Sequence, residues 1–275
     1  METDPHTVSR TSGIVIEDRG CARILRLNRP GTLNAFDRPM LAEFKELVHE
    51  ADRDPAVVGL VVTGTGRGFC SGLDHSALRE LADQGSSGLA GTGRPPGERA
   101  PLLFGYLIGI DKPVIAAVNG VVAGGGFVLA LSCDFRFSAP EAEFVTSFAR
   151  RGLVAEHATS WLLPRLVGTS HALDLLLSSR RIGVAEAERI GLTTRVTPDP
   201  VTTACEYIDQ LADSVSPASM RDIKRQVYRD WARSFEDSAE SAYDLNAAAL
   251  DRPDAREGAA SLIERRPPSF ARLGE

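Results

Sequence analysis

The sequence predicts a layered α/β protein whose strands are concentrated before residue 200 and whose helices dominate after it. Two continuous apolar runs, VVGLVVT at 57–63 and PVIAAV at 113–118, have the length and composition of strands that are buried on both faces. Helical patterns separate the strands, so that β-β-α-like units recur along the chain. The 275 residues are 43% hydrophobic and 25% charged, with a formal net charge of −6. This balance is typical of a globular protein and does not favour nucleic-acid binding.

The individual elements follow from local signals. GIVIED and ARILRLN flank the turn dipeptide Arg19-Gly20, which predicts two strands over 13–28. Apolar residues recur at helical spacing over 38–51, directly after Asp37 as a start signal, and predict an amphipathic helix. The glycines of 63–68 predict a turn. Further strands are expected at 134–139 and 193–196, and helices at 157–177, 184–190, 201–214, 217–250 and 254–265.

The remaining segments bear on location and partners. None of the four cysteines forms a CxxC pair, which indicates reduced thiols in a cytoplasmic protein, and the five histidines lack the spacing of metal ligands. Residues 1–11 lack the apolar core of a signal peptide and predict a flexible N-terminal tail. Residues 83–100 are rich in Gly, Ser and Pro and predict a surface loop, which either covers a site or is an insertion without a role.

The 20 residues from Val114 to Cys133 carry no charge, which by length alone is sufficient to span a bilayer. The stretch contains the turn dipeptide Asn119-Gly120 and three consecutive glycines, Gly124 to Gly126, which disfavour one continuous helix. We therefore predict a strand at 113–118, a turn at 119–123 and a short buried helix at about 125–132. Glycines at a helix start either permit tight packing or present backbone N–H groups to a negatively charged oxygen.

A second stretch of this kind, Gly68–His75, follows a strand and a turn and precedes a predicted helix. Asp74 is a candidate N-terminal cap of that helix. Two such stretches can supply two N–H donors to one carbonyl oxygen, which is what stabilisation of a thioester enolate requires.

Four segments in this order resemble the enoyl-CoA hydratase/isomerase, or crotonase, family: RPGTLNAF at 29–36, GRGFCSGLD at 66–74, the stretch 112–139, and RIGVAEAERIGLTTRVTP at 181–198. The resemblance covers about residues 12–230. It implies a crotonase-like spiral of ββα units over 12–200 and a helical C-terminal oligomerisation region over 201–275. It also implies a homotrimer or a dimer of trimers, and an acyl-CoA thioester as substrate, with CoA as part of the substrate and no other cofactor.

The resemblance also implies site residues. It assigns the two oxyanion-hole N–H groups to Leu73 and Gly125, and we expect the neighbouring Gly124 to contact the substrate. Contacts to the adenine and pantetheine parts of CoA are implied for Ser71, Asp74 and His75, and a basic residue near the CoA phosphates for Arg29.

The acid/base residues depart from the family pattern. Family hydratases use two glutamates, and the apolar Val128 and Phe148 stand at those two positions here, where we expect them to line the acyl pocket. Glu156 is the acidic residue that remains in this region, at a position where related isomerases carry their catalytic acid. The alternative is that Glu156 only stabilises a helix start. His157 is interpreted as a helix-start residue or as a support of the site, and Cys70 as a packing residue.

Three functions stay open from the sequence. The first is an enoyl-CoA isomerase with Glu156 as the single acid/base, since one carboxylate can take a proton from C2 and return it to C4. The second is a hydratase in which Glu156 and an ordered water replace the missing pair. The third is a non-catalytic acyl-CoA-binding protein. We expect no metal, nucleic-acid or membrane partner, and the sequence does not specify the acyl chain.

Overall fold

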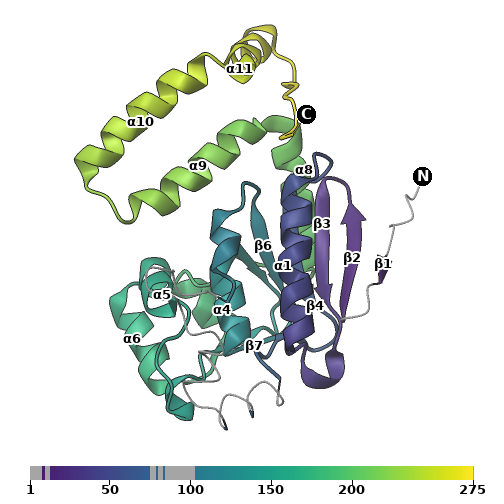
Figure 1. Ribbon diagram of the computed structural model, residues 1–275, viewed down its shortest axis with the longest axis vertical. Coiled ribbons are helices and arrows are strands. Elements are labelled where there is room, and N and C mark those ends of the chain that lie inside the picture. The colour runs from purple at the N-terminus through teal and green to yellow at the C-terminus, as the bar shows by residue number, and fades with distance from the viewer. Residues whose placement is uncertain (1–7, 10–12, 75–78, 80–82, 84–102, 275) are drawn as a thin grey trace.

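The computed structural model describes residues 8–9, 13–74, 79, 83 and 103–274, and it consists of two β-sheets flanked by helices (Figure 1). Within this described part, the larger sheet has the strand order β1-β2-β3-β4-β6-β8-β11 and the smaller sheet the order β10-β9-β7-β5. The mixed α/β class predicted from the sequence is confirmed.

From β4 to β9 the strands alternate between the two sheets. The larger sheet contains β1 Val8–Ser9, β2 Ile14–Arg19, β3 Ala22–Leu27, β4 Gly59–Gly64, β6 Val114–Val118, β8 Phe135–Ser138 and β11 Arg195–Val196. The smaller sheet contains β5 Gly68–Cys70, β7 Val121–Ala123, β9 Glu143–Val145 and β10 Ile182–Gly183. Each of β4, β6 and β8 enters the larger sheet in parallel and is followed by a strand of the smaller sheet. This spiral advance is the recurrence of ββα units that the sequence predicts.

The helices agree with most of the predicted positions. Their bounds are α1 Arg38–Arg53, α4 Gly125–Ser132, α5 Thr159–Val167, α6 Thr169–Ser178, α7 Val184–Arg189, α8 Pro200–Ser214, α9 Pro217–Asp230, α10 Phe235–Leu250 and α11 Pro253–Glu264. Asp37 caps α1 by accepting from the Met40 N–H at 2.9 Å, as its position before the helix indicates.

Two predicted helices are each divided in the structure. The predicted helix 157–177 is α5 and α6, which separate at Gly168, where φ is +78°. The predicted helix 217–250 is α9 and α10, which separate because Ser234 caps a new helix by accepting from the Asp237 N–H at 3.1 Å.

The larger sheet is buried on both faces. Alternate residues of β4 and β6 point to opposite sides. Leu60, Val62 and Val114 join the cluster that packs under α1, while Val61 and Ile115 join a second cluster with residues of α8. The continuous apolar runs therefore reflect a sheet covered by helices on both sides, as predicted.

The uncharged stretch from 114 to 133 is divided among β6, β7 and α4. The predicted strand and the predicted short helix are confirmed, but the predicted turn at 119–123 is wrong in its second half, because Val121–Ala123 form β7. These residues pair in parallel with β5 and β9, contacts that local sequence cannot reveal. Among the described residues, no helix is long and apolar enough to cross a membrane.

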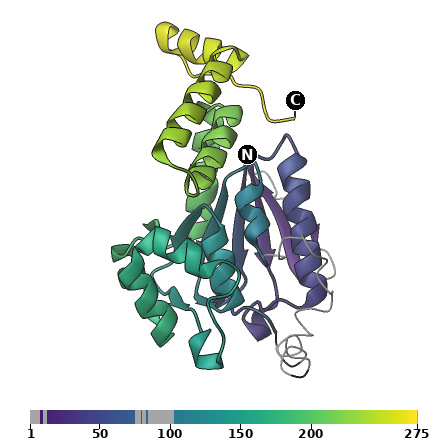
Figure 2. The ribbon, with the colours of Figure 1, turned by 60° about the vertical axis from the view of Figure 1, so that its left-hand side comes forward.

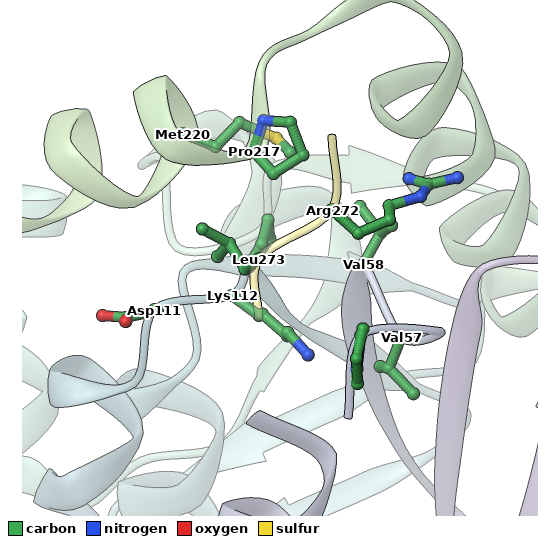
Figure 3. Close-up of a pocket in the computed structure, with 10 residues that line it drawn as sticks. Val57, Val58, Asp111, Lys112, Pro217, Met220, Arg272 and Leu273 are labelled. Carbon is green, nitrogen blue, oxygen red and sulfur yellow. The ribbon is translucent and has the colours of Figure 1, made fainter. Parts of the chain in front are cut away.

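The last three helices extend from the body of the molecule (Figures 1 and 2). Their first member, α9, is attached through Lys224 and Tyr228, which contact the Asp134 carboxylate at 2.8 and 2.9 Å. After α11 the chain returns to the body, where Arg272 and Leu273 line a small pocket together with Val57, Val58, Lys112, Pro217 and Met220 (Figure 3).

Two predictions concern segments that the structure describes only in part. Of the predicted flexible tail, Val8 and Ser9 pair antiparallel with Ile16 and Val15, and the rest lies outside the described residues. The predicted loop 83–100 lies outside the described residues except for Asp83.

Candidate active site

Two asparagine side chains, the buried Asn34 and the half-buried Asn119, hold the segment that follows β4. Asn34 Nδ2 donates to the Gly68 carbonyl at 2.7 Å, and Asn119 Nδ2 donates to the same oxygen at 3.2 Å. Asn119 Oδ1 also accepts from the Gly64 N–H at 3.1 Å. Because both amides satisfy backbone groups of this turn, they fix the path of the chain into β5.

The backbone of Leu73 is oriented by a parallel bridge to Phe36. The Phe36 N–H donates to the Gly72 carbonyl at 2.8 Å, and the Asp74 N–H donates to the Phe36 carbonyl at 3.0 Å. In a parallel bridge of this kind, the N–H of the central residue faces away from the partner. The Leu73 N–H is thus directed away from Phe36, and no described residue accepts a hydrogen bond from it.

The second candidate donor is Gly125 at the start of α4. Gly124 precedes it with φ +51° and ψ −118°, a conformation that favours glycine, and its carbonyl accepts from the N–H groups of Phe127 and Val128. Within the described chain the Gly125 N–H has no acceptor. It belongs to the unsatisfied first turn of the helix, where the dipole is positive.

The two donor segments are in direct contact. A Cβ atom built on Gly72 would lie 2.8 Å from the Gly125 nitrogen, and one built on Gly125 would lie 3.3 Å from the Gly72 Cα. Because Leu73 follows Gly72 directly, the N–H groups of Leu73 and Gly125 lie at one junction of β5 and α4. Two neighbouring N–H donors without acceptors, one of them at a helix start, can stabilise a carbonyl oxygen that acquires negative charge.

The positions of the two missing glutamates are buried and apolar. Val128 in α4 is 1% exposed and Phe148 is 4% exposed, and both belong to the hydrophobic cluster on which Leu73 and Leu103 pack. Neither side chain can supply a proton-transfer group.

Glu156 lies in the turn that immediately precedes α5. Its backbone carbonyl accepts from the Thr159 N–H at 2.9 Å, and its half-buried carboxylate makes no hydrogen bond or ion pair with a described residue. The adjacent His157 Nδ1 accepts from the Leu103 N–H at 3.4 Å, a long hydrogen bond. Leu103 Cδ2 in turn lies 3.5 Å from the position of a Cβ atom on Gly125. The turn that carries Glu156 is therefore linked through Leu103 to the junction of β5 and α4.

This turn is conformationally strained. His157 and Ala158 both have positive φ, +49° and +63°, although neither is a glycine. A left-handed conformation costs an L-residue roughly 1–2 kcal/mol. Strain of this kind is concentrated at functional sites, where the surrounding structure enforces it.

The residues expected to contact CoA have the following surroundings. Arg29 contacts the carboxylates of Asp37 and Asp74 at 3.0 and 3.3 Å, so its charge is balanced within the chain. The Ser71 hydroxyl donates to the Thr32 carbonyl at 2.9 Å. His75 lies outside the described residues. The assignment of these residues to CoA stays a prediction.

Cys70 has the environment of a packing residue. Its side chain is fully buried, and burial raises the pKa of the thiol to about 12. A thiol with so high a pKa is a poor nucleophile at neutral pH, which agrees with its interpretation from the sequence.

Sequence reasoning missed four residues of the site. Asn34 and Asn119 lie within recognised motifs, but their role as anchors of β5 depends on contacts across about 30 and 50 residues. Leu103 had no distinguishing signal. Arg151 Nη1 lies 4.0 Å from the position of a Cβ atom on Gly124, which brings a positive charge to the start of α4.

A family model and curated relatives with similar sequences indicate the same protein family. A family model described as enoyl-CoA hydratase/isomerase matches residues 18–272. A probable enoyl-CoA hydratase of Mycobacterium tuberculosis is 31% identical over 260 residues, which cover 94% of this chain and 97% of that protein. The 1,2-epoxyphenylacetyl-CoA isomerase of Escherichia coli is also 31% identical, with 90% of this chain and 93% of that protein covered.

The fold agrees with solved structures. The crystal structure of an enoyl-CoA hydratase subunit from Geobacillus kaustophilus superposes with a TM-score of 0.85 at 30% identity, covering 97% of this chain and all of that one. Relatives named as hydratases and relatives named as isomerases are thus equally similar in sequence.

Proposed function

The chain belongs to the enoyl-CoA hydratase/isomerase family, and we propose that it is an enoyl-CoA isomerase in which Glu156 is the single acid/base. The observation that carries this proposal is the junction of Leu73 and Gly125, where two backbone N–H groups without acceptors in the described chain adjoin two buried apolar positions. The proposed substrate class is a 3-enoyl-CoA thioester.

The reaction needs one base and one site for negative charge. The thioester oxygen accepts hydrogen bonds from the N–H groups of Leu73 and Gly125. The Glu156 carboxylate takes a proton from C2, the electron pair of that C–H bond forms a C1–C2 double bond, and the π electrons of the carbonyl group move onto the thioester oxygen. The resulting dienolate collapses as the carboxyl group returns a proton to C4, so that the C3–C4 double bond becomes a C2–C3 double bond. The reaction as written consumes no water and needs no metal or redox partner.

Three features support isomerisation. Val128 and Phe148 cannot activate a water molecule, and their burial excludes water from the positions they occupy. The Glu156 carboxylate has no ion-pair partner among the described residues, which leaves it available for proton transfer. Its turn is linked through His157 and Leu103 to Gly125.

A hydratase is the second candidate, because relatives named as hydratases are as similar to the chain as those named as isomerases. In that case Glu156 would orient a water molecule towards C3 of a 2-enoyl-CoA. A single carboxylate would then have to manage both the water and the α-proton, which two groups share in the family pattern.

Purified protein incubated separately with 3-hexenoyl-CoA and 2-hexenoyl-CoA separates these functions. Isomerisation converts the 3-enoyl thioester into the conjugated 2-enoyl thioester without a change of mass, and mass spectrometry with ultraviolet absorbance detects it. A product heavier by one water would replace the isomerase proposal by the hydratase. Binding of both thioesters without turnover would leave an acyl-CoA-binding protein.

We also infer that the chain assembles as a trimer or a dimer of trimers. The last three helices expose large apolar side chains, which are normally covered by a partner surface: Ile223, Val227, Phe235, Tyr243, Leu250, Leu262 and Ile263. Light scattering during size-exclusion chromatography should give a mass of three or six times 29.5 kDa. A mass of one chain at micromolar concentration would contradict the assembly.

A further inference from the structure

The side chain of His157 is not used by the proposed reaction, yet it joins two parts of the site. It is half-buried beside Glu156, and its Nδ1 accepts from the Leu103 N–H at 3.4 Å. Leu103 is 54 residues away in the sequence and lies against Gly125. A histidine side chain therefore connects the turn of the candidate acid to a residue that packs against the candidate oxyanion site.

The hydrogen bond defines the protonation state of the imidazole. A nitrogen that accepts from an N–H group carries no proton, so the neutral ring must hold its proton on Nε2. Burial lowers the pKa of His157, whereas the charge of Glu156 raises it. With the net direction downwards from the usual value, His157 is neutral and able to accept at neutral pH.

The backbone conformation of His157 and Ala158 indicates that the surrounding structure holds the His157 side chain in this position. His157 and Ala158 occupy the centre of a turn closed by the hydrogen bond from the Thr159 N–H to the Glu156 carbonyl, and both have positive φ. Such a turn suits asparagine and glycine much better than histidine and alanine. The contact with Leu103 is one interaction that this unfavourable conformation makes possible.

We propose that His157 is a positioning residue. Its neutral imidazole holds the Glu156 turn against Leu103 through the hydrogen bond from the Leu103 N–H, and this contact fixes the position of the Glu156 carboxylate relative to the oxyanion site at Gly125. Protonation of His157 places a hydrogen on Nδ1, opposite the Leu103 N–H, and the two donors then repel. The hydrogen bond between His157 and Leu103 is therefore lost as the pH falls through the pKa of His157. The proposal rests on the proposed function in one respect only, which is that Glu156 is the acid/base.

The charged group that acts on His157 is its neighbour. Glu156 on the same turn is the charge that affects it among the described residues. Leu103 faces it with a backbone N–H, and α5 begins with the uncharged Thr159 and Ser160. Replacing His157 alone therefore isolates what protonation of its imidazole contributes to the acid limb of the activity profile.

Two variants of His157 test the role in turnover. His157→Asn retains an acceptor close to the place of Nδ1, tolerates positive φ and does not titrate near neutrality. Above pH 8 its kcat should be close to that of the parent. At lower pH its kcat should decrease less than that of the parent, because no imidazole becomes protonated. His157→Gly relaxes the backbone but has no acceptor. Above the pKa of His157, where the parent imidazole is neutral, it should lower kcat by roughly 10- to 100-fold with a much smaller change in KM, and the difference from the parent should shrink as the pH falls below that pKa. His171→Asn in α6 is the matched histidine control and should change neither kcat nor the pH profile.

A measurement without turnover keeps the two proposals distinguishable. In protein labelled with 15N-histidine, the His157 signals, assigned by their loss in His157→Asn, should show the Nε2–H form at neutral pH and a pKa below the usual value of histidine. An Nδ1–H form would overturn the positioning role, and so would a His157→Gly variant with the kcat and acid limb of the parent. If the parent turns over neither enoyl-CoA while the Nε2–H form is observed, the proposed reaction is wrong, and the hydrogen bond between Leu103 and the neutral His157 is still supported.

Discussion

Replacement of Glu156 by glutamine is expected to lower kcat for a 3-enoyl-CoA by about 10²- to 10⁴-fold, the range that proton transfer by a positioned side chain contributes. Glutamine has nearly the same shape and size as glutamate, but its amide cannot accept the C2 proton. The Glu156 carboxylate has no ion-pair partner among the described residues, so its loss removes no structural contact there. Acyl-CoA binding and the melting temperature should therefore remain close to those of the parent.

Steady-state kinetics of Glu156→Gln with matched variants make this result specific. Glu141→Gln, at an exposed position just before β9, is the control for the loss of one negative charge and should retain the parent kcat. Glu156→Asp keeps the acid but shortens the side chain by one methylene group, and an intermediate loss of kcat is expected. Full activity of Glu156→Gln would show that another group moves the proton.

The large elements of the fold were predictable because their signals are local. The strands β4 and β6 are continuous apolar runs, and α1 has an apolar face with Asp37 at its start. The strands β5, β7 and β9 were missed because each has three residues, too few for a periodic pattern. They exist because turns of the spiral stack on one another and supply their hydrogen-bond partners.

The division of the C-terminal helices illustrates the same limit. The apolar stripe over 217–250 predicts one helix, but the chain turns between Trp231 and Ser234. Trp231 packs on Trp161 of α5 with ring centroids 5.0 Å apart, and Arg165 lies over the Trp161 ring. A contact between α5 and the end of α9 is not visible in either segment alone.

The sequence motifs predicted which segments form the site, but they did not predict the contacts between residues that are far apart in the sequence. The glycine-rich stretches suggested two helix starts with free N–H groups, and the resemblance to the family named Leu73 and Gly125. Which groups Arg29 contacts could not be derived, because Asp37 and Asp74 are separated from it by 8 and 45 residues and approach only in the folded chain. The link from His157 to Leu103 likewise depends on packing across 54 residues.

The second large effect is expected at Gly126, where α4 crosses the backbone of Cys70. A Cβ atom at this position would lie 2.1 Å from the Cys70 carbonyl oxygen and 2.7 Å from its carbonyl carbon. Neither atom can rotate away, because both belong to the backbone. In Gly126→Ala, α4 and the end of β5 must therefore move apart, at a cost of about 1–3 kcal/mol in the free energy of unfolding.

This displacement acts directly on the candidate oxyanion site. Gly125 precedes Gly126, and Leu73 follows Cys70 by three residues, so separation of the two segments moves their N–H groups apart. Loss of one correctly placed donor typically costs about 10²- to 10³-fold in kcat. Gly126→Ala should therefore combine a lower melting temperature with a loss of kcat of at least this size, measured at a temperature where the variant is folded.

Gly258→Ala in α11 is the matched control. A Cβ atom there meets no atom within 4 Å, and the residue lies inside a regular helix, so the free energy of unfolding should rise by up to about 1 kcal/mol with unchanged kcat. Gly72→Ala is a milder test of the same junction, since its Cβ atom would lie 2.8 Å from the Gly125 nitrogen at a φ of +101°. If Gly126→Ala and Gly72→Ala both keep the parent kcat, the contact between β5 and α4 does not set the geometry of the reaction, and the thioester oxygen must be bound elsewhere.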